Sequence, residues 1–133
     1  MKKFLQLTMF LVAVLLSSTA MAQTGFIVFY EGNNGSQNIV DTKDDSPGQD
    51  FRPAQNDEAR SVQLVAVRAN CTIQVFDDPN GSLRDDFCII TTKRFIGSYI
   101  VNTFEQSYED DDVRVTYIRN NGLDGKVSRI KIL

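Results

Sequence analysis

Short runs of alternating apolar and polar residues fill most of the chain after residue 25, and they are rich in Val, Ile, Phe, Tyr and Thr. Neighbouring side chains of a strand point to opposite faces, so this alternation predicts half-buried strands and no helix. Turn-forming segments separate the runs, which predicts an all-β, antiparallel sandwich or barrel. The polar stretch 41–58 is expected to be one long surface loop with a short irregular strand that the pattern does not locate. The clearest predicted strands are 26–30, 61–67, 72–76, 87–91, 99–104, 113–118 and 127–132.

A repeat becomes visible when the first part of the chain is laid over the second. The stretch IVFYEGNNGS at 27–36 matches IQVFDDPNGS at 73–82, with every counterpart 46 positions later. Both read apolar, any residue, apolar, aromatic, acid, two spacers and then Asn-Gly-Ser. In so short a chain, this repeat indicates two copies of one supersecondary unit.

The aromatic–acid pair at a strand end, followed by a Gly-containing turn, resembles the first hairpin of the βγ-crystallin Greek-key family. That family closes each motif with the signature (N/D)(N/D)-x-x-(S/T)-S, and NDEARS at 56–61 and DGKVSR at 124–129 lie where the two copies would close. The resemblance covers about residues 26–132. It implies an antiparallel Greek-key β-sandwich with two crystallin-like motifs in one domain.

The chain departs from the family pattern at three positions. Gln37 stands about where the family places a Gly, Arg60 replaces the hydroxyl residue of the first closing segment, and Gly125 replaces the second acid or amide of the other. The second copy is also longer by about 22 residues if it closes at 124–129. Alternatively it closes at 111–115, and 113–118 then forms an added hairpin with 127–132.

Calcium binding is implied by the same resemblance, since the family places the ion between the closing segment of one motif and the first hairpin of the other. Carried over residue by residue, the candidate ligands are Glu31, Asp57, Asp77 and Ser128. Calcium takes six to eight oxygen ligands. Arg60 removes one oxygen and brings a cation close, so we expect at most one weak site. The alternative is a related fold that has lost its metal.

Two acidic stretches are weaker metal candidates. In FDDPNGS at 76–82, no frame that begins at either Asp places Gly81 at the sixth position of an EF-hand loop. Asp78-Pro79-Asn80-Gly81 instead predicts a type I turn. The run of four acids at 109–112 is interpreted as a solvated loop between strands, with cation binding as the alternative.

The N-terminus has the pattern of a secretory signal peptide. Lys2 and Lys3 precede an apolar run at 4–16, and small residues at 20 and 22 predict cleavage after Ala22. Residues 23–133 would then form a single secreted or periplasmic domain without a membrane span. An uncleaved anchor is the alternative.

The two cysteines, Cys71 and Cys88, both lie in this secreted part. An oxidising compartment and an even count favour a disulfide between them. The alternative is two buried free thiols that pack as small apolar residues.

Composition narrows the function. The chain has no histidine, which excludes His-based triads and His metal sites. Without the two lysines of the signal, 12 basic residues face 17 acidic ones, and a net charge of −5 argues against nucleic acid as a partner.

The sequence therefore predicts a secreted, non-enzymatic βγ-crystallin-like module with weak calcium binding and a structural or stress-protective role. The alternative is a secreted protein-interaction module, such as an inhibitor or adhesion factor, that acts through the loop at 41–58 or 105–112. No partner and no oligomeric state can be assigned from the sequence.

Overall fold

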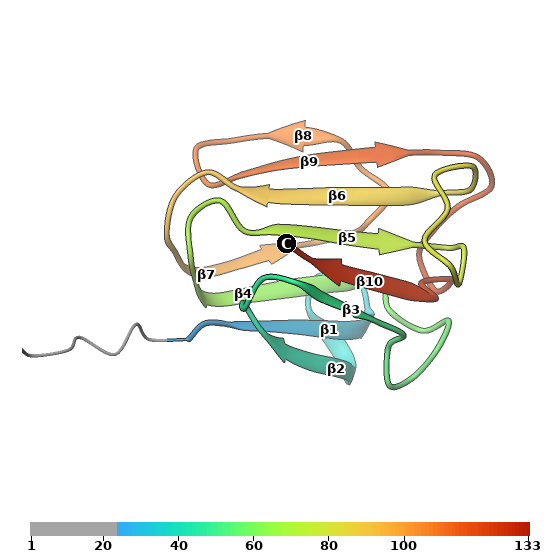
Figure 1. Cartoon of the computed structure of the whole chain (residues 1–133), viewed down its shortest axis with the longest axis horizontal. Helices are drawn as coiled ribbons and strands as arrows, with labels where there is room; N and C mark the ends of the chain where they lie inside the picture. Colours follow the sequence, from blue (N-terminus) through green and yellow to red (C-terminus); the bar gives the residue numbers. More distant parts are fainter. Residues whose placement is uncertain (1–23) are drawn as a thin grey trace, which may run out of the picture.

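A computed structural model of the chain describes residues 24–133, so the signal peptide predicted at 1–22 lies outside the described residues. Within them the protein is all-β, with ten strands in two antiparallel sheets (Figure 1). The same residues contain no helix long and apolar enough to cross a membrane. The strands are β1 (Phe26–Gly32), β2 (Ser36–Asp44), β3 (Gln49–Phe51), β4 (Ser61–Val67), β5 (Thr72–Phe76), β6 (Phe87–Thr92), β7 (Ile96–Val101), β8 (Tyr108–Glu109), β9 (Val113–Ile118) and β10 (Arg129–Ile132).

The core lies between the two sheets, and alternate residues of the inner strands point into it. Ile27 and Phe29 of β1 and Leu64 of β4 are fully buried from the first sheet, and Ile73 and Val75 of β5 from the second. Complete burial of such a side chain contributes roughly 1.5–3 kcal/mol. The predicted antiparallel sandwich is thereby confirmed.

The two halves of the chain follow one pairing scheme. The first sheet has the order β2-β1-β4-β7 and the second the order β3-β10-β5-β6-β9-β8. The four main strands are β1 to β4 in the first half and β5, β6, β7 and β10 in the second, where β8 and β9 are additional. In each half the fourth main strand pairs with the first, and the first pairs with the second, which gives β4-β1-β2 and β10-β5-β6. The remaining strand of each half, β3 or β7, pairs in the sheet of the other half.

The register makes individual residues of the two halves equivalent. Tyr30 pairs with Ser61 in the first half, and Phe76 pairs with Arg129 in the second. Tyr30 and Phe76 are counterparts in the sequence repeat. Ser61 and Arg129 are therefore equivalent too, and positions in β4 and the segment before it correspond to positions 68 residues later.

The extra residues of the second half form the hairpin β8–β9, which extends the second sheet beyond β6. The chain then returns to pair β10 with β5, so the second half closes late. The alternative hairpin between 113–118 and 127–132 is wrong, because β5 and β6 lie between β9 and β10. Buried Val113 and Val115 hold the added hairpin against the core.

Two other predictions need correction. The segment 41–58 contains the expected short strand, β3, but its first residues are not loop, since β2 continues to Asp44. Strand β2 escaped prediction because it lies at a sheet edge and buries only Val40. Strand β7 was expected at 99–104, but it begins at Ile96 and ends at Val101.

The predicted disulfide is also wrong: Cys71 and Cys88 are free and buried. In the β5–β6 register Cys88 lies opposite Val75, whereas Cys71 exchanges hydrogen bonds with Thr92. Four residues of strand, about 13 Å, separate the two positions, and a disulfide requires Cα atoms within about 7 Å. Burial raises the pKa of the Cys88 thiol to about 12 and also raises that of Cys71, so both remain neutral thiols.

Candidate functional site

The two segments that precede β4 and β10 meet at one end of the sandwich, and we call them the closing loops (52–60 and 119–128). The Asp57 N–H donates to the Val127 carbonyl (3.2 Å), and the Gly125 N–H donates to the Ala59 carbonyl (3.0 Å). Asp57 and Gly125 are equivalent, and so are Ala59 and Val127. The two hydrogen bonds are therefore related by an approximate two-fold axis. Asp57 and Gly125 both have left-handed backbone, with φ of 63° and 75°.

One side of this axis gathers oxygen atoms. The Ser128 hydroxyl donates to Asp57 Oδ1 at 2.6 Å, and the Ser128 N–H donates to the Phe76 carbonyl at 2.8 Å. Phe76 is the last residue of β5, so the second bond holds Ser128 beside Asp77. Three of the four predicted ligands, Asp57, Asp77 and Ser128, are thus brought together from three separate segments.

The negative charge of Asp77 is unfavourable in this group. Burial raises the pKa of its carboxyl group, and the negative charges of Asp85, Asp86 and Asp57 raise it further, although Lys126 partly opposes them. Its carboxylate accepts no hydrogen bond from any residue in 24–133. A cation beside Asp77 would relieve this repulsion.

The other side of the axis has different chemistry. The Arg60 N–H donates to the Tyr30 carbonyl (2.8 Å), just as Ser128 donates to Phe76. The Arg60 guanidinium lies over Gly125, where an added Cβ would be 2.8 Å from its Nη2 atom. A cation and a glycine therefore occupy the places that a hydroxyl and a carboxylate occupy on the first side.

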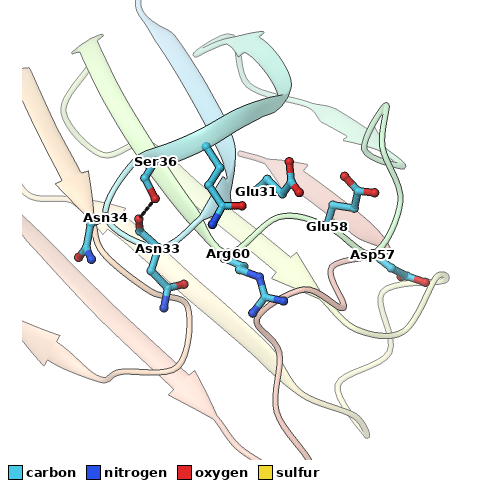
Figure 2. A pocket seen from close by; sticks show the side chains of 8 residues that line it. Glu31, Asn33, Asn34, Ser36, Asp57, Glu58 and Arg60 are labelled. Atoms are coloured by element: carbon cyan, nitrogen blue, oxygen red, sulfur yellow. Dashed lines mark hydrogen bonds between the residues drawn. The ribbon is translucent and has the colours of Figure 1, made fainter.

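An open polar pocket of about 560 Å³ lies between the first hairpin and the first closing loop. In the view of Figure 2, Glu31 and Glu58 lie on one side of the pocket, Asn33 and Asn34 lie on the other, and Arg60 is between them. Glu31 accepts a hydrogen bond from Asn38 at 2.9 Å. The fourth predicted ligand thus lines this pocket together with Asp57 and does not belong to the Asp77 group. No set of three or more His, Cys, Asp or Glu side chains within residues 24–133 is arranged to hold a metal.

The stretch FDDPNGS forms the predicted turn. The Gly81 N–H donates to the Asp78 carbonyl at 3.0 Å. The Asp78 carboxylate accepts the N–H groups of Asn80 and Ser82, both at 2.9 Å. These bonds occupy Asp78 within the turn, and they leave Asp77 as the carboxylate available to a ligand.

The acidic run at 109–112 closes the β8–β9 hairpin and is held by basic partners. Glu109 pairs with Lys93 and Arg114, both at 3.1 Å, and these contacts lower the pKa of Glu109 to about 2. Asp112 pairs with Arg94. The run is therefore a hairpin turn in which two of the four acids, Glu109 and Asp112, are paired with basic side chains.

Asp86 is the important acid that sequence reasoning missed. It is fully buried and accepts four hydrogen bonds, from the Tyr117 hydroxyl and from the N–H groups of Asn120, Asn121 and Gly122, at 2.7–2.9 Å. Burial alone would raise its pKa, but these donors outweigh burial and lower it. Asp86 holds the start of the second closing loop in place, although it lies more than 30 positions earlier in the sequence. The sequence offers no signal for this role, because Asp86 resembles the acids around it.

Comparison with known proteins found no family model, no curated protein and no solved structure that matches this chain.

Proposed function

We propose that this chain is a secreted, non-enzymatic βγ-crystallin-like domain that binds one calcium ion at Asp57, Asp77 and Ser128. The observation that carries the proposal is the contact between Asp57 and Ser128 beside Asp77. It exists only because the two closing loops meet across an approximate two-fold axis. In this role calcium would join the two halves of the domain and add stability to a structural or stress-protective protein.

The pairing scheme supports the family resemblance. A Greek key places its fourth strand beside the first, in the spatial order 4-1-2-3. Both halves have the 4-1-2 part of this order, with the third strand in the opposite sheet. In addition, the register makes 56–61 equivalent to 124–129, which is one of the two segments that the signatures offered for the close of the second copy.

The donor set also suits the ion. Carboxylate and hydroxyl oxygens are hard ligands that calcium prefers, and carbonyl groups and water would have to complete a shell of six to eight oxygens. Lys126 lies close enough to Asp77 to offset part of the rise in its pKa, so it competes with a cation. We therefore expect weak binding. The equivalent position on the other side of the axis carries Arg60 and Gly125, which limits the protein to one site.

Thermal unfolding in calcium tests the proposal. A ligand that binds only the folded state at ten times its Kd stabilises it by about 1.4 kcal/mol, which raises the Tm of a domain this size by about 5 °C. EDTA should reverse the rise. Asp57→Asn should abolish it, whereas the matched variant Asp111→Asn, at an exposed acid of the β8–β9 turn, should retain it. An unchanged Tm at millimolar calcium would falsify the calcium site.

A protein-interaction role through 41–58 or 105–112 stays a prediction. Parts of both segments belong to strands, and 109–112 is fastened by ion pairs. Pull-down with the wild-type protein and with a variant shortened at 41–58 would test that role.

A further inference from the structure

The four sheet edges of this protein are not equally protected. An edge strand presents unpaired N–H and C=O groups to which another strand can bond, and proteins usually shorten, charge or bend such strands. Among the described strands, β3 has three residues and β8 has two. Strand β2 carries Asp41, Lys43 and Asp44, and its register with β1 shifts twice. These three edges are therefore protected from pairing with a strand of another molecule.

Strand β7 has none of these protections. Its six residues, IGSYIV, include no charge and no Pro, and they pair with β4 without a register shift. Within residues 24–133, β4 is the only strand hydrogen-bonded to β7, and no backbone group of 96–101 bonds to another element. Two large apolar side chains are exposed beside this edge: Phe95 is 61% exposed and Ile100 is 38% exposed.

We propose that β7 pairs antiparallel with β7 of a second copy of this chain. Two four-stranded first sheets would then join into one continuous sheet across a two-fold axis. Unpaired backbone groups specify an extended strand as the partner, and the uncharged edge lets identical strands approach without repulsion.

The charges that flank β7 do not oppose a second copy. Lys93 and Arg94 precede the strand and are already paired within the chain, with Glu109 and Asp112. Glu105 follows the strand and accepts the N–H groups of Leu123 and Asp124. Two identical β7 edges therefore approach each other without strong repulsion between like charges.

The two-fold axis also explains the exposed Ile100. An axis that relates antiparallel strands of one sheet stands perpendicular to that sheet, so the outer faces of both copies remain on the same side. Ile100 is exposed on the outer face of β7. The Ile100 side chains of the two copies would therefore lie near the seam on a shared face and lose exposure together.

Analytical ultracentrifugation of the purified protein over a range of concentrations tests the proposal, with and without EDTA because this pairing does not need calcium. The wild type should show a monomer–dimer equilibrium in both conditions. Gly97→Lys places a charge on the edge, and an added Cβ there meets no heavy atom of residues 24–133 within 4 Å, so the fold should survive. This variant should dimerise about tenfold more weakly or worse. Thr116→Lys, the same change at an exposed position of β9, should dimerise like the wild type.

Cysteine cross-linking supplies the second measurement. Cys71 and Cys88 are buried, so Ser98→Cys introduces the accessible thiol at the seam. Oxidation should link Ser98→Cys into covalent dimers and should not link Thr116→Cys. A wild-type protein that stays monomeric at all concentrations, or a dimer that Gly97→Lys leaves unchanged, overturns the proposal. Pairing of monomeric wild type with a strand of another protein overturns it as well.

Discussion

The two hairpins that open the two halves share a sequence pattern, but they are fastened in opposite ways. The first turns within three residues, 33–35, and is secured from outside by buried Ser61. The Ser61 hydroxyl donates to the Gly32 carbonyl (2.6 Å) and accepts the Gly35 N–H (2.9 Å). The second hairpin needs residues 77–86 to connect its strands. It is held by Asp86, the last residue of this connection, whose carboxylate accepts the Asn120 N–H of the second closing loop.

This difference shows that the sequence repeat determines the strands of each hairpin but not the hydrogen bonds that hold the hairpin in place. The position equivalent to Ser61 is Arg129, which reaches away to pair with Asp50. The second hairpin has therefore lost its serine anchor, and a buried carboxylate holds its longer loop instead. A charge in that position is costly unless every oxygen is hydrogen-bonded, and Asp86 meets this condition.

Removal of Asp86 should have the largest effect on stability. Asp86→Ala leaves three backbone N–H groups and the Tyr117 hydroxyl without their acceptor. Since a bond to a charged group contributes about 1.5–3 kcal/mol, we expect a loss of at least about 3 kcal/mol in urea unfolding followed by circular dichroism. The neighbouring variant Asp85→Ala, which removes an acceptor for one N–H, should cost less than half as much. Equal losses would show that Asp86 is no special anchor.

The pH dependence of the same protein provides an independent check. The pKa of Asp86 is lower in the folded state than its ordinary value of 3.8. Its stabilisation is therefore complete above about pH 5 and is lost as pH falls through the folded pKa. Asp86→Asn should show a shallower loss of stability in acid than the wild type, and identical slopes would contradict the assignment.

Ser61→Ala should have an intermediate effect, because it breaks two hydrogen bonds that the buried Ser61 hydroxyl makes with the first hairpin. We expect a loss of about 1–2 kcal/mol. The equivalent change in the other half, Arg129→Ala, removes a partly exposed ion pair and should cost less than about 1 kcal/mol. Chemical denaturation of the two variants measures the comparison directly. A larger loss from Arg129→Ala would reverse our assignment of the two anchors.

The smallest effect should come from building a counterpart of the proposed calcium site on the other side of the two-fold axis. Arg60→Ser with Gly125→Asp copies the Asp57–Ser128 pair to the other side of the two-fold axis. The left-handed backbone at 125 accepts Asp, as it does at 57, and the clash with Arg60 disappears. If the proposed site is correct, calorimetric titration should give one calcium ion per chain for the wild type and two for the double variant. A single ion in the double variant would show that the two sides are not interchangeable.

Strand prediction succeeded where burial alternates along the chain. Strands β4, β5 and β9 have the predicted bounds, because their inward residues are apolar and their outward ones mostly polar. Strand β2 gave no such signal, since it needs only Val40 in the core. The signatures marked 56–61 and left the second closing segment open between 124–129 and 111–115, and the register makes 124–129 the equivalent of 56–61.

Features that depend on register or on distant partners were beyond the sequence. The spacing of Cys71 and Cys88 suits a disulfide, but the connection at 77–86 sets a register that holds them apart. Asp86 reaches partners more than 30 positions away, and no local pattern marks that contact. The approach of Asp57 to Ser128 was implied only by the family resemblance.

Because the two thiols are buried and held apart, they cannot form a disulfide with each other while the sheet stays intact. Cys71 and Cys88 lie at the two ends of the β5–β6 pair, in the middle of the six-stranded sheet. A thiol reagent can reach them only when these central strands open. The rate at which the native protein is alkylated will therefore report the opening of its core, without any label added to the chain.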